Sequence, residues 1–294
     1  MTNPASPAVR RRRLAAELRA IRESTGKSGD NVAAALRWSP SKISRYELAR
    51  TGLKIADVEK LLDYYQVTGD RRELLVEMAR DAARKGWWEA FSDGLSEDYQ
   101  QFIGLEHEAR SIAIWHVEVV TGLLQTEAYA RNIISSYGLV EPIAPRMVDR
   151  LVTVRMRRQQ VLERDPPVQL SVVFDESVLR RRVGDDQVMY EQLQRLLKES
   201  ERPNVTLRIF PLDQQHPIYG ESFVIFGFGS DTTGAAMQDV VTAELLRNLY
   251  AVESERETHL HRIAYRHLFE TALDVQASRD LISHIAESVW SGNR

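Results

Sequence analysis

Helix start and stop residues recur at short intervals in the first 52 residues of the chain. Gly26 and Gly52 are typical helix terminators, whereas Ser28 and Ser39 are typical N-cap residues. Pro40 directly after Ser39 suits the first position of a helix. Apolar residues at helical spacing fill the intervals between these signals. The pattern predicts helices at about residues 7–25, 28–36 and 39–48.

Two more helical patterns follow, the first carrying Ile55, Val58 and Leu61 and the second covering about residues 70–85. Residues 1–85 are therefore expected to form an all-α, five-helix domain. Residues 86–98 begin with Gly-Trp-Trp and break the periodicity. Because a flexible tether would be polar, we expect an aromatic linker whose rings pack between two domains.

The remaining chain, residues 99–294, mixes helical patterns with short β-rich runs, which is typical of an α+β domain with a small sheet of three or four strands. The whole chain is then an α+β multidomain protein. The expected helices cover residues 99–114, 126–136, 145–164, 186–199, 254–272 and a segment from 278. The expected strands cover residues 168–174, 205–210 and 222–228, with a fourth candidate near 237–241.

Composition excludes several classes of protein. A chain of 294 residues suits two domains, and the absence of cysteine rules out disulfides, thiolate zinc sites and cysteine nucleophiles. A reducing cytoplasm fits that composition. The arginines at 10–13 precede charged residues instead of a signal peptide's apolar run, and the sequence contains no stretch of 18 apolar residues. We therefore expect a cytoplasmic protein without a membrane span.

The net charge of -3 conceals an asymmetry. Residues 1–69 hold 13 Lys and Arg against 7 Asp and Glu, which gives +6, whereas the remainder holds 39 - 13 = 26 against 42 - 7 = 35, which gives -9. A basic domain joined to an acidic body directs polyanions to one surface, so this balance favours nucleic-acid binding by the N-terminal domain.

The predicted third helix carries two contrasting faces, as the second helix of a helix-turn-helix must. Ile43 would lock the helix onto its neighbour and Tyr46 would pack against the body. Arg45 on the outward arc can bind guanine O6 and N7, and Lys42 can reach guanine or phosphate. The alternative is a solvated helix face, which the capped helix pair and the basic charge disfavour. The residues predicted to contact DNA are Arg10, Arg11, Ser28, Ser39, Ser41, Lys42, Ser44, Arg45 and Lys54.

The arginine run at 10–13 occupies a helix start, where the helix dipole disfavours positive charge. Contact with phosphates or insertion into a minor groove would offset that cost. A solubilising tail is the alternative explanation.

The motifs resemble those of a known class. Gly26-Lys27-Ser28, followed by the segment Trp38 to Glu47, resembles the Xre-type, lambda-repressor-like helix-turn-helix of actinomycete regulators, over about residues 10–68. Two departures are Gly29, where the family often has Gln, and Arg37, where it has Gly; the first puts a DNA contact in doubt.

A second group of motifs lies in the second domain and resembles the C-terminal domain of unknown function of WhiJ-like, antitoxin-like regulators. The residues that carry this likeness are Leu105-Glu106, Ala109, Gly122 to Glu127, Tyr129-Ala130, Arg158-Gln159, Asp175-Glu176, Leu179-Arg180 and Gln192-Leu193. Thr121 stands where the family commonly has Pro. The resemblance implies transcriptional control, often alongside a small partner protein encoded by a neighbouring gene.

Other candidate sites are weaker. His259, His261 and His267 are crowded, but their spacing does not place them on one helix face for a metal. Asp175-Glu176 follows a strand end, where capping and ion pairing explain the carboxylates as well as catalysis does. The pattern from Gly122 to Tyr129 predicts a helix start capped by Thr126. The alternative is that this segment lines a binding groove. We therefore predict no catalytic residue, metal or cofactor.

The favoured function is a transcription regulator that binds double-stranded DNA at a palindromic operator as a homodimer and is controlled through its second domain. Two alternatives stay open. The chain could be an antitoxin-like protein that holds a small partner protein and binds DNA for autoregulation, or its second domain could be an enzyme.

Overall fold

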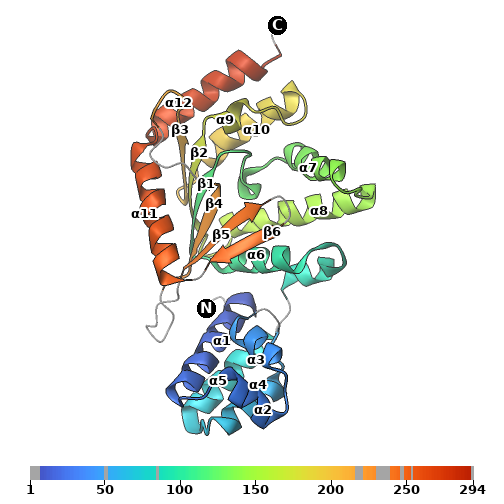
Figure 1. Cartoon of the computed structure of the whole chain (residues 1–294). Coiled ribbons are helices and arrows are strands. Elements are labelled where there is room, and N and C mark those ends of the chain that lie inside the picture. The colour runs from blue at the N-terminus through green and yellow to red at the C-terminus, as the bar shows by residue number, and fades with distance from the viewer. Residues whose placement is uncertain are drawn as a thin grey trace. The chain divides into compact units, whose positions relative to one another are not determined.

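The computed structural model describes residues 7–49, 52–83, 86–215, 221–229, 239–245, 248–252 and 254–292. Its contacts divide the chain into two compact units, Met1–Ala90 and Phe91–Arg294 (Figure 1). The division falls inside the segment 86–98, for which a linker role stays a prediction. That segment contains a 3-10 helix, η1 (Trp87–Gly94), with Trp88 buried.

The N-terminal unit is all-α, as predicted. Its core receives at least one buried side chain from each helix, for example Leu14, Val32, Ile43, Leu62 and Leu75. The helices are α1 (Pro7–Ser24), α2 (Gly29–Leu36), α3 (Pro40–Glu47), α4 (Ile55–Tyr64) and α5 (Gly69–Ala82).

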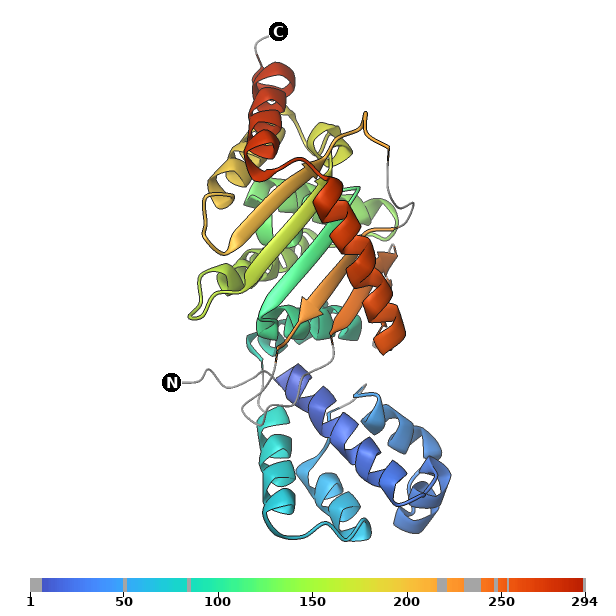
Figure 2. The same ribbon diagram turned by 90° about the vertical axis from the view of Figure 1, so that its left-hand side faces the viewer.

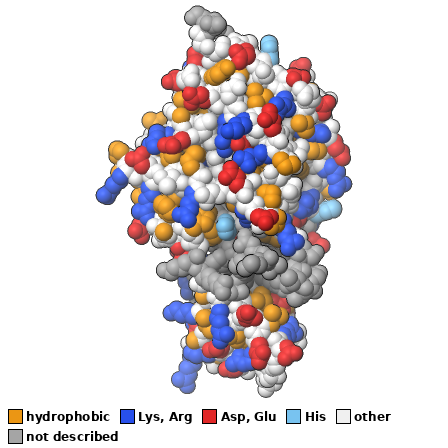
Figure 3. Space-filling view, turned by 180° about the vertical axis from the view of Figure 1, so that it is seen from behind, with side chains coloured by type: hydrophobic (Ala, Val, Ile, Leu, Met, Phe, Trp, Pro, Cys, Tyr) orange, Lys and Arg blue, Asp and Glu red, His pale blue; other side chains and the backbone are white. Residues whose placement is uncertain are grey.

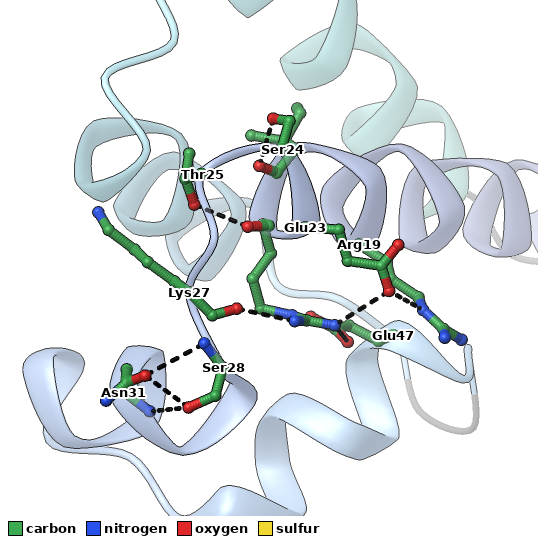
Figure 4. Close-up of polar contacts among 10 residues, drawn as sticks. Arg19, Glu23, Ser24, Thr25, Lys27, Ser28, Asn31 and Glu47 are labelled. Carbon is green, nitrogen blue, oxygen red and sulfur yellow. Dashed lines mark hydrogen bonds and ion pairs between the residues drawn. The ribbon is translucent and has the colours of Figure 1, made fainter.

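Local hydrogen bonds start α2 and α3 at the predicted serines. The hydroxyl of Ser28 accepts from the amide of Asn31 at 3.1 Å, and the Asn31 side chain accepts from the Ser28 amide at 3.1 Å (Figure 4). This capping box satisfies two amides that would otherwise lack partners. The hydroxyl of Ser39 accepts from the amide of Lys42 at 3.3 Å, and Pro40 occupies the first position of α3.

The second unit is α+β, as predicted, and is built on one six-stranded sheet of order β3-β2-β1-β4-β5-β6. Strands β1, β2 and β3 run parallel, whereas β4 and β5 pair antiparallel with their neighbours. The strands are β1 (Ser111–His116), β2 (Gln169–Asp175), β3 (Val205–Phe210), β4 (Phe223–Gly227), β5 (Val240–Leu245) and β6 (Asn248–Val252).

Helices cover both faces of this sheet. The helix α11 lies across one face, and α6, α8 and α10 lie on the opposite side (Figures 1 and 2). All five residues of β4 are consequently buried. The helical elements are α6 (Glu97–Glu108), η2 (Gly122–Leu124), α7 (Glu127–Ser136), η3 (Tyr137–Leu139), α8 (Pro145–Arg158), η4 (Gln159–Leu162), α9 (Ser177–Arg180), α10 (Asp186–Glu199), α11 (Glu255–Thr271), α12 (Val275–Ile285) and the π-helical η5 (Ala286–Trp290).

The sheet is larger than the three or four strands expected. The predicted helix 99–114 was wrong in its last part, because α6 ends at Glu108 and Ser111–His116 forms β1. Ile112 and Ile114 follow the two-residue period of a strand, and both are buried between β2 and β4. The strand β6 was also missed, and the strand expected near 237–241 is β5 at Val240–Leu245.

Candidate nucleic-acid interface

The short helix α3 has a buried face and an exposed face. Ile43 and Tyr46 are 3% and 6% exposed and pack in the core of the N-terminal unit, as predicted. Ser41, Ser44 and Arg45 are exposed. Within the described residues, the guanidinium of Arg45 meets no acidic side chain. The exposed arc therefore presents two hydroxyls and one cation to solvent.

An ion pair joins α1 to the end of α3. Arg22 donates from Nε to Oε1 of Glu47 at 2.6 Å and from Nη2 to Oε2 at 2.9 Å. A third bond runs from Nη1 of Arg22 to the carbonyl of Lys27 at 2.9 Å. Both side chains are largely buried, and the bond to Glu47 raises the pKa of Arg22. This bidentate pair fixes α3 against α1.

Lys42 does not share the outward placement predicted for it. Its ammonium lies 3.0 Å from Oδ2 of Asp57 in α4 and 3.7 Å from the centre of the Trp38 ring. The Tyr46 hydroxyl donates to the same Asp57 oxygen at 2.6 Å. Burial alone would raise the pKa of Asp57, but the hydrogen bonds from Tyr46 and Lys42 outweigh burial and lower that pKa. The attraction to Asp57 and Trp38 explains why Lys42 folds back.

The other predicted contacts occupy helix starts. The hydroxyl of Ser28 serves the capping box, and that of Ser39 caps α3 and lies 3.0 Å from the Ser41 hydroxyl. Lys54 is exposed at the N-cap position of α4 and its side chain makes no capping bond there. Arg11 is partly buried on α1. The Arg10 side chain lies outside the described residues.

The second unit contains a buried polar network. The buried Arg158 donates from Nε and Nη2 to the two carboxylate oxygens of Glu106, each at 2.7 Å, and from Nη1 to the hydroxyl of Tyr99 at 2.6 Å. Arg155 donates to Gln125 at 2.9 Å, and Gln125 donates to the carbonyl of Val120 at 2.7 Å. These bonds tie α6, α8 and the segment around η2 together.

Both units match described families. Residues 99–284 match a domain of unknown function, DUF5753, and cover more than half of the chain. The chain belongs to the DUF5753 family. Residues 13–75 match a helix-turn-helix domain, which marks the chain as a DNA-binding regulator. A search of curated proteins finds no match.

Three polar side chains from the motifs of the DUF5753 unit make local hydrogen bonds at helix starts. Thr126 caps α7 by accepting from the Tyr129 amide at 3.2 Å, which confirms the predicted cap. Asp175 accepts from the Ser177 amide at 2.9 Å, and Glu176 accepts from Arg180 at 2.7 Å. Capping and ion pairing are thus both present at these two carboxylates.

The described part of the DUF5753 unit offers no cluster of three His, Asp or Glu side chains suited to a metal ion. His261, one of the three crowded histidines, stacks edge-on against Phe223 instead. Among the described residues, no helix combines the length and apolar character needed to cross a membrane. One face of this unit shows acidic and basic side chains interspersed (Figure 3).

The residues that hold α3 in place were not predicted from the sequence. Arg22 and Glu47 are 25 positions apart, and no local pattern links them. Asp57 lies in the first turn of α4, where an acidic residue is ordinary. Trp38 was noted only as part of a motif, although an aromatic ring before an N-cap serine could have suggested a partner for Lys42.

Proposed function

We propose that this chain is a sequence-specific transcription regulator that places α3 in the major groove of a palindromic operator. The exposed Arg45 carries this proposal, because it stands without an acidic partner among the described residues on a helix whose opposite face is buried. Its planar guanidinium suits the O6 and N7 acceptors of guanine. The basic balance of residues 1–69, 13 - 7 = +6, would draw the unit to DNA.

The remaining exposed groups fit supporting roles. Ser41 and Ser44 lie beside Arg45 and can reach a base edge or a phosphate. Ser28 and Ser39 mark helix N-termini, which favour anions, and Lys54 adds an exposed charge at the start of α4. Arg10 and Arg11 would add phosphate contacts that do not depend on sequence.

A homodimer would suit this small DNA-binding unit. A single recognition helix covers few base pairs, and two helices reading half-sites one DNA turn apart give higher affinity and a palindromic site. The DUF5753 unit would control the dimer, through contact between copies, a ligand or a small partner protein.

Selection of bound fragments from a genomic pool at one stated salt concentration tests the proposal. Wild type should enrich sites with two related half-sites, and Arg45→Ala should relax one position in each half-site. Arg80→Ala is the matched control, because it removes an exposed arginine from α5. Identical footprints for wild type and Arg45→Ala would refute the recognition-helix assignment.

A further inference from the structure

We propose that Lys42 is a positioning residue. It fixes the orientation of α3 relative to α4, whereas Ser41, Ser44 and Arg45 contact the DNA bases. This inference rests on the proposed function. Its basis is the place of the Lys42 ammonium, 3.0 Å from the Asp57 carboxylate and 3.7 Å from the centre of the Trp38 ring. The lysine thereby joins the turn before α3 to α3 itself and to α4.

The Asp57 carboxylate is the centre of this arrangement. Asp57 is 8% exposed, and its Oδ2 accepts from the Tyr46 hydroxyl at 2.6 Å while facing the Lys42 ammonium. It also lies in the first turn of α4, where the helix dipole favours an anion. Moving Lys42 to a DNA phosphate would leave a nearly buried carboxylate without its nearest cation, and such separation is costly.

Trp38 closes the other side of the lysine. Its amide donates to the carbonyl of Ala33 at 2.8 Å, which fixes the residue at the end of α2. Its ring stands edge-on to Tyr46, with centroids 6.0 Å apart and planes at 85°. The Lys42 ammonium thus lies over one aromatic face and 5.4 Å from the centre of the Tyr46 ring. Cation–π attraction adds to the ion pair in holding it there.

Contacts with the DNA bases depend on the orientation of α3. Ser41, Ser44 and Arg45 must reach base edges together, so a small rotation of α3 would misplace all three. A lysine neutralised by Asp57 releases no DNA counterions, whereas a lysine on a phosphate contributes about 0.9 to the slope of log affinity against log salt concentration. The two roles of Lys42 therefore differ in a measurable quantity.

The test uses the full chain with Lys42→Met, Asp57→Asn and the double variant. Dissociation constants are measured on a selected site and a scrambled duplex over a salt series. We expect each single variant to lower the ratio of selected to scrambled affinity at least about tenfold, because misplacing the Arg45 contact with guanine would by itself have an effect of this size. The double variant should be no worse than either single variant, and Lys42→Met should keep the wild-type salt slope.

Lys54→Met is the matched control, because it removes an exposed lysine at the start of α4. If Lys54 contacts phosphate, this variant loses about 0.9 of the salt slope and keeps the affinity ratio. Lys42→Arg can still pair with Asp57. This variant should therefore keep most of the wild-type ratio of selected to scrambled affinity, which Lys42→Met loses. Thermal unfolding identifies any variant that does not fold, in which case Lys42→Gln replaces Lys42→Met.

Two results would overturn the positioning role. One is a salt slope for Lys42→Met that falls by about 0.9 while Asp57→Asn keeps the affinity ratio, which would make Lys42 a phosphate contact. The other is a Lys42→Met variant with an unchanged ratio. A wild-type chain that prefers no site would refute the proposed function itself, which is a separate outcome.

Discussion

Arg22 on α1 holds Glu47 on α3 through two parallel hydrogen bonds of 2.6 Å and 2.9 Å. Because both side chains are largely buried, removing one partner leaves the other with an unsatisfied charge. Arg22→Met should therefore lower the free energy of unfolding of the N-terminal unit by about 2 kcal/mol, the scale of hydrogen bonds to charged groups. Urea unfolding of the full chain measures the change.

Arg19→Met is the control for the Arg22 prediction. Arg19 pairs with Glu23 four residues later on the same helix, but both side chains are more than half exposed. Its removal should leave the free energy of unfolding nearly unchanged, because solvent screens an exposed ion pair. Equal losses for Arg19→Met and Arg22→Met would contradict the view that the Arg22–Glu47 pair stabilises the placement of α3 against α1.

The pH dependence of the DUF5753 unit should contain a contribution from His116. Burial lowers the pKa of His116 to about 4, against a smaller opposing effect of its hydrogen bond with the Val119 carbonyl. As the pH falls, His116 becomes protonated near pH 6.5 in the unfolded chain but only near pH 4 in the folded unit. The contribution of His116 to the free energy of unfolding is fully present above pH 6.5. It falls as the pH drops from 6.5 to 4, by at most about 1.4 kcal/mol per pH unit.

Denaturant unfolding at pH 7 and pH 5 checks the effect of His116. Between pH 7 and pH 5, His116 should lower the free energy of unfolding of the wild type by about 1 to 2 kcal/mol. His116→Gln should lack this part of the decrease. His259→Gln, at an exposed position on α11, should lose as much as wild type. A His116→Gln variant with the wild-type pH dependence would contradict the assignment.

Arg37 ends α2 in a left-handed conformation, with φ at 56° and ψ at 42°. Glycine adopts this conformation without the steric cost of a Cβ atom. Arg37→Gly should therefore raise the free energy of unfolding by about 0.5 to 1 kcal/mol in thermal or urea unfolding. Arg37→Ala keeps the Cβ atom and should give no gain. A gain of equal size from alanine would show that the arginine side chain, not the backbone, is the source.

Local patterns predicted the elements that local forces determine. The caps at Ser28 and Ser39 and the buried Ile43 follow from neighbours within four residues, and the structure confirms them. The strand β1 depends on partners far along the chain, because Ile114 pairs with Val172 in β2 and Val224 in β4. A short window shows the two-residue period of Ile112 and Ile114 but not these distant partners, and both residues were assigned to the preceding helix.

The same distinction holds at the candidate interface. The period of α3 predicted that Arg45 faces outward, and the structure agrees. It also placed Lys42 outward, but a long side chain can fold back to any partner within reach. That partner, Asp57, belongs to another helix, α4, which the helical periodicity of α3 does not reveal.

Gly122 in η2 approaches two arginines of α8 so closely that a methyl group does not fit. A Cβ atom there would lie 2.9 Å from Cδ of Arg155 and 3.3 Å from Nη2 of Arg158. Arg158 cannot move aside, because Glu106 and Tyr99 hold all three of its guanidinium nitrogens. Gly122→Ala should therefore destabilise the DUF5753 unit by about 1 to 3 kcal/mol, the usual cost of overpacking.

Unfolding of the full chain, followed by a probe in the DUF5753 unit, measures the effect of Gly122→Ala. Gly138→Ala is the matched control, because the nearest atom to a Cβ there is 3.9 Å away, an ordinary van der Waals contact. It should change stability by less than about 0.5 kcal/mol. Combining Gly122→Ala with Arg155→Ala should recover part of the loss, since the nearest obstacle is the flexible Arg155 stem. No recovery in the double variant would place the clash on Arg158 and its rigid network instead.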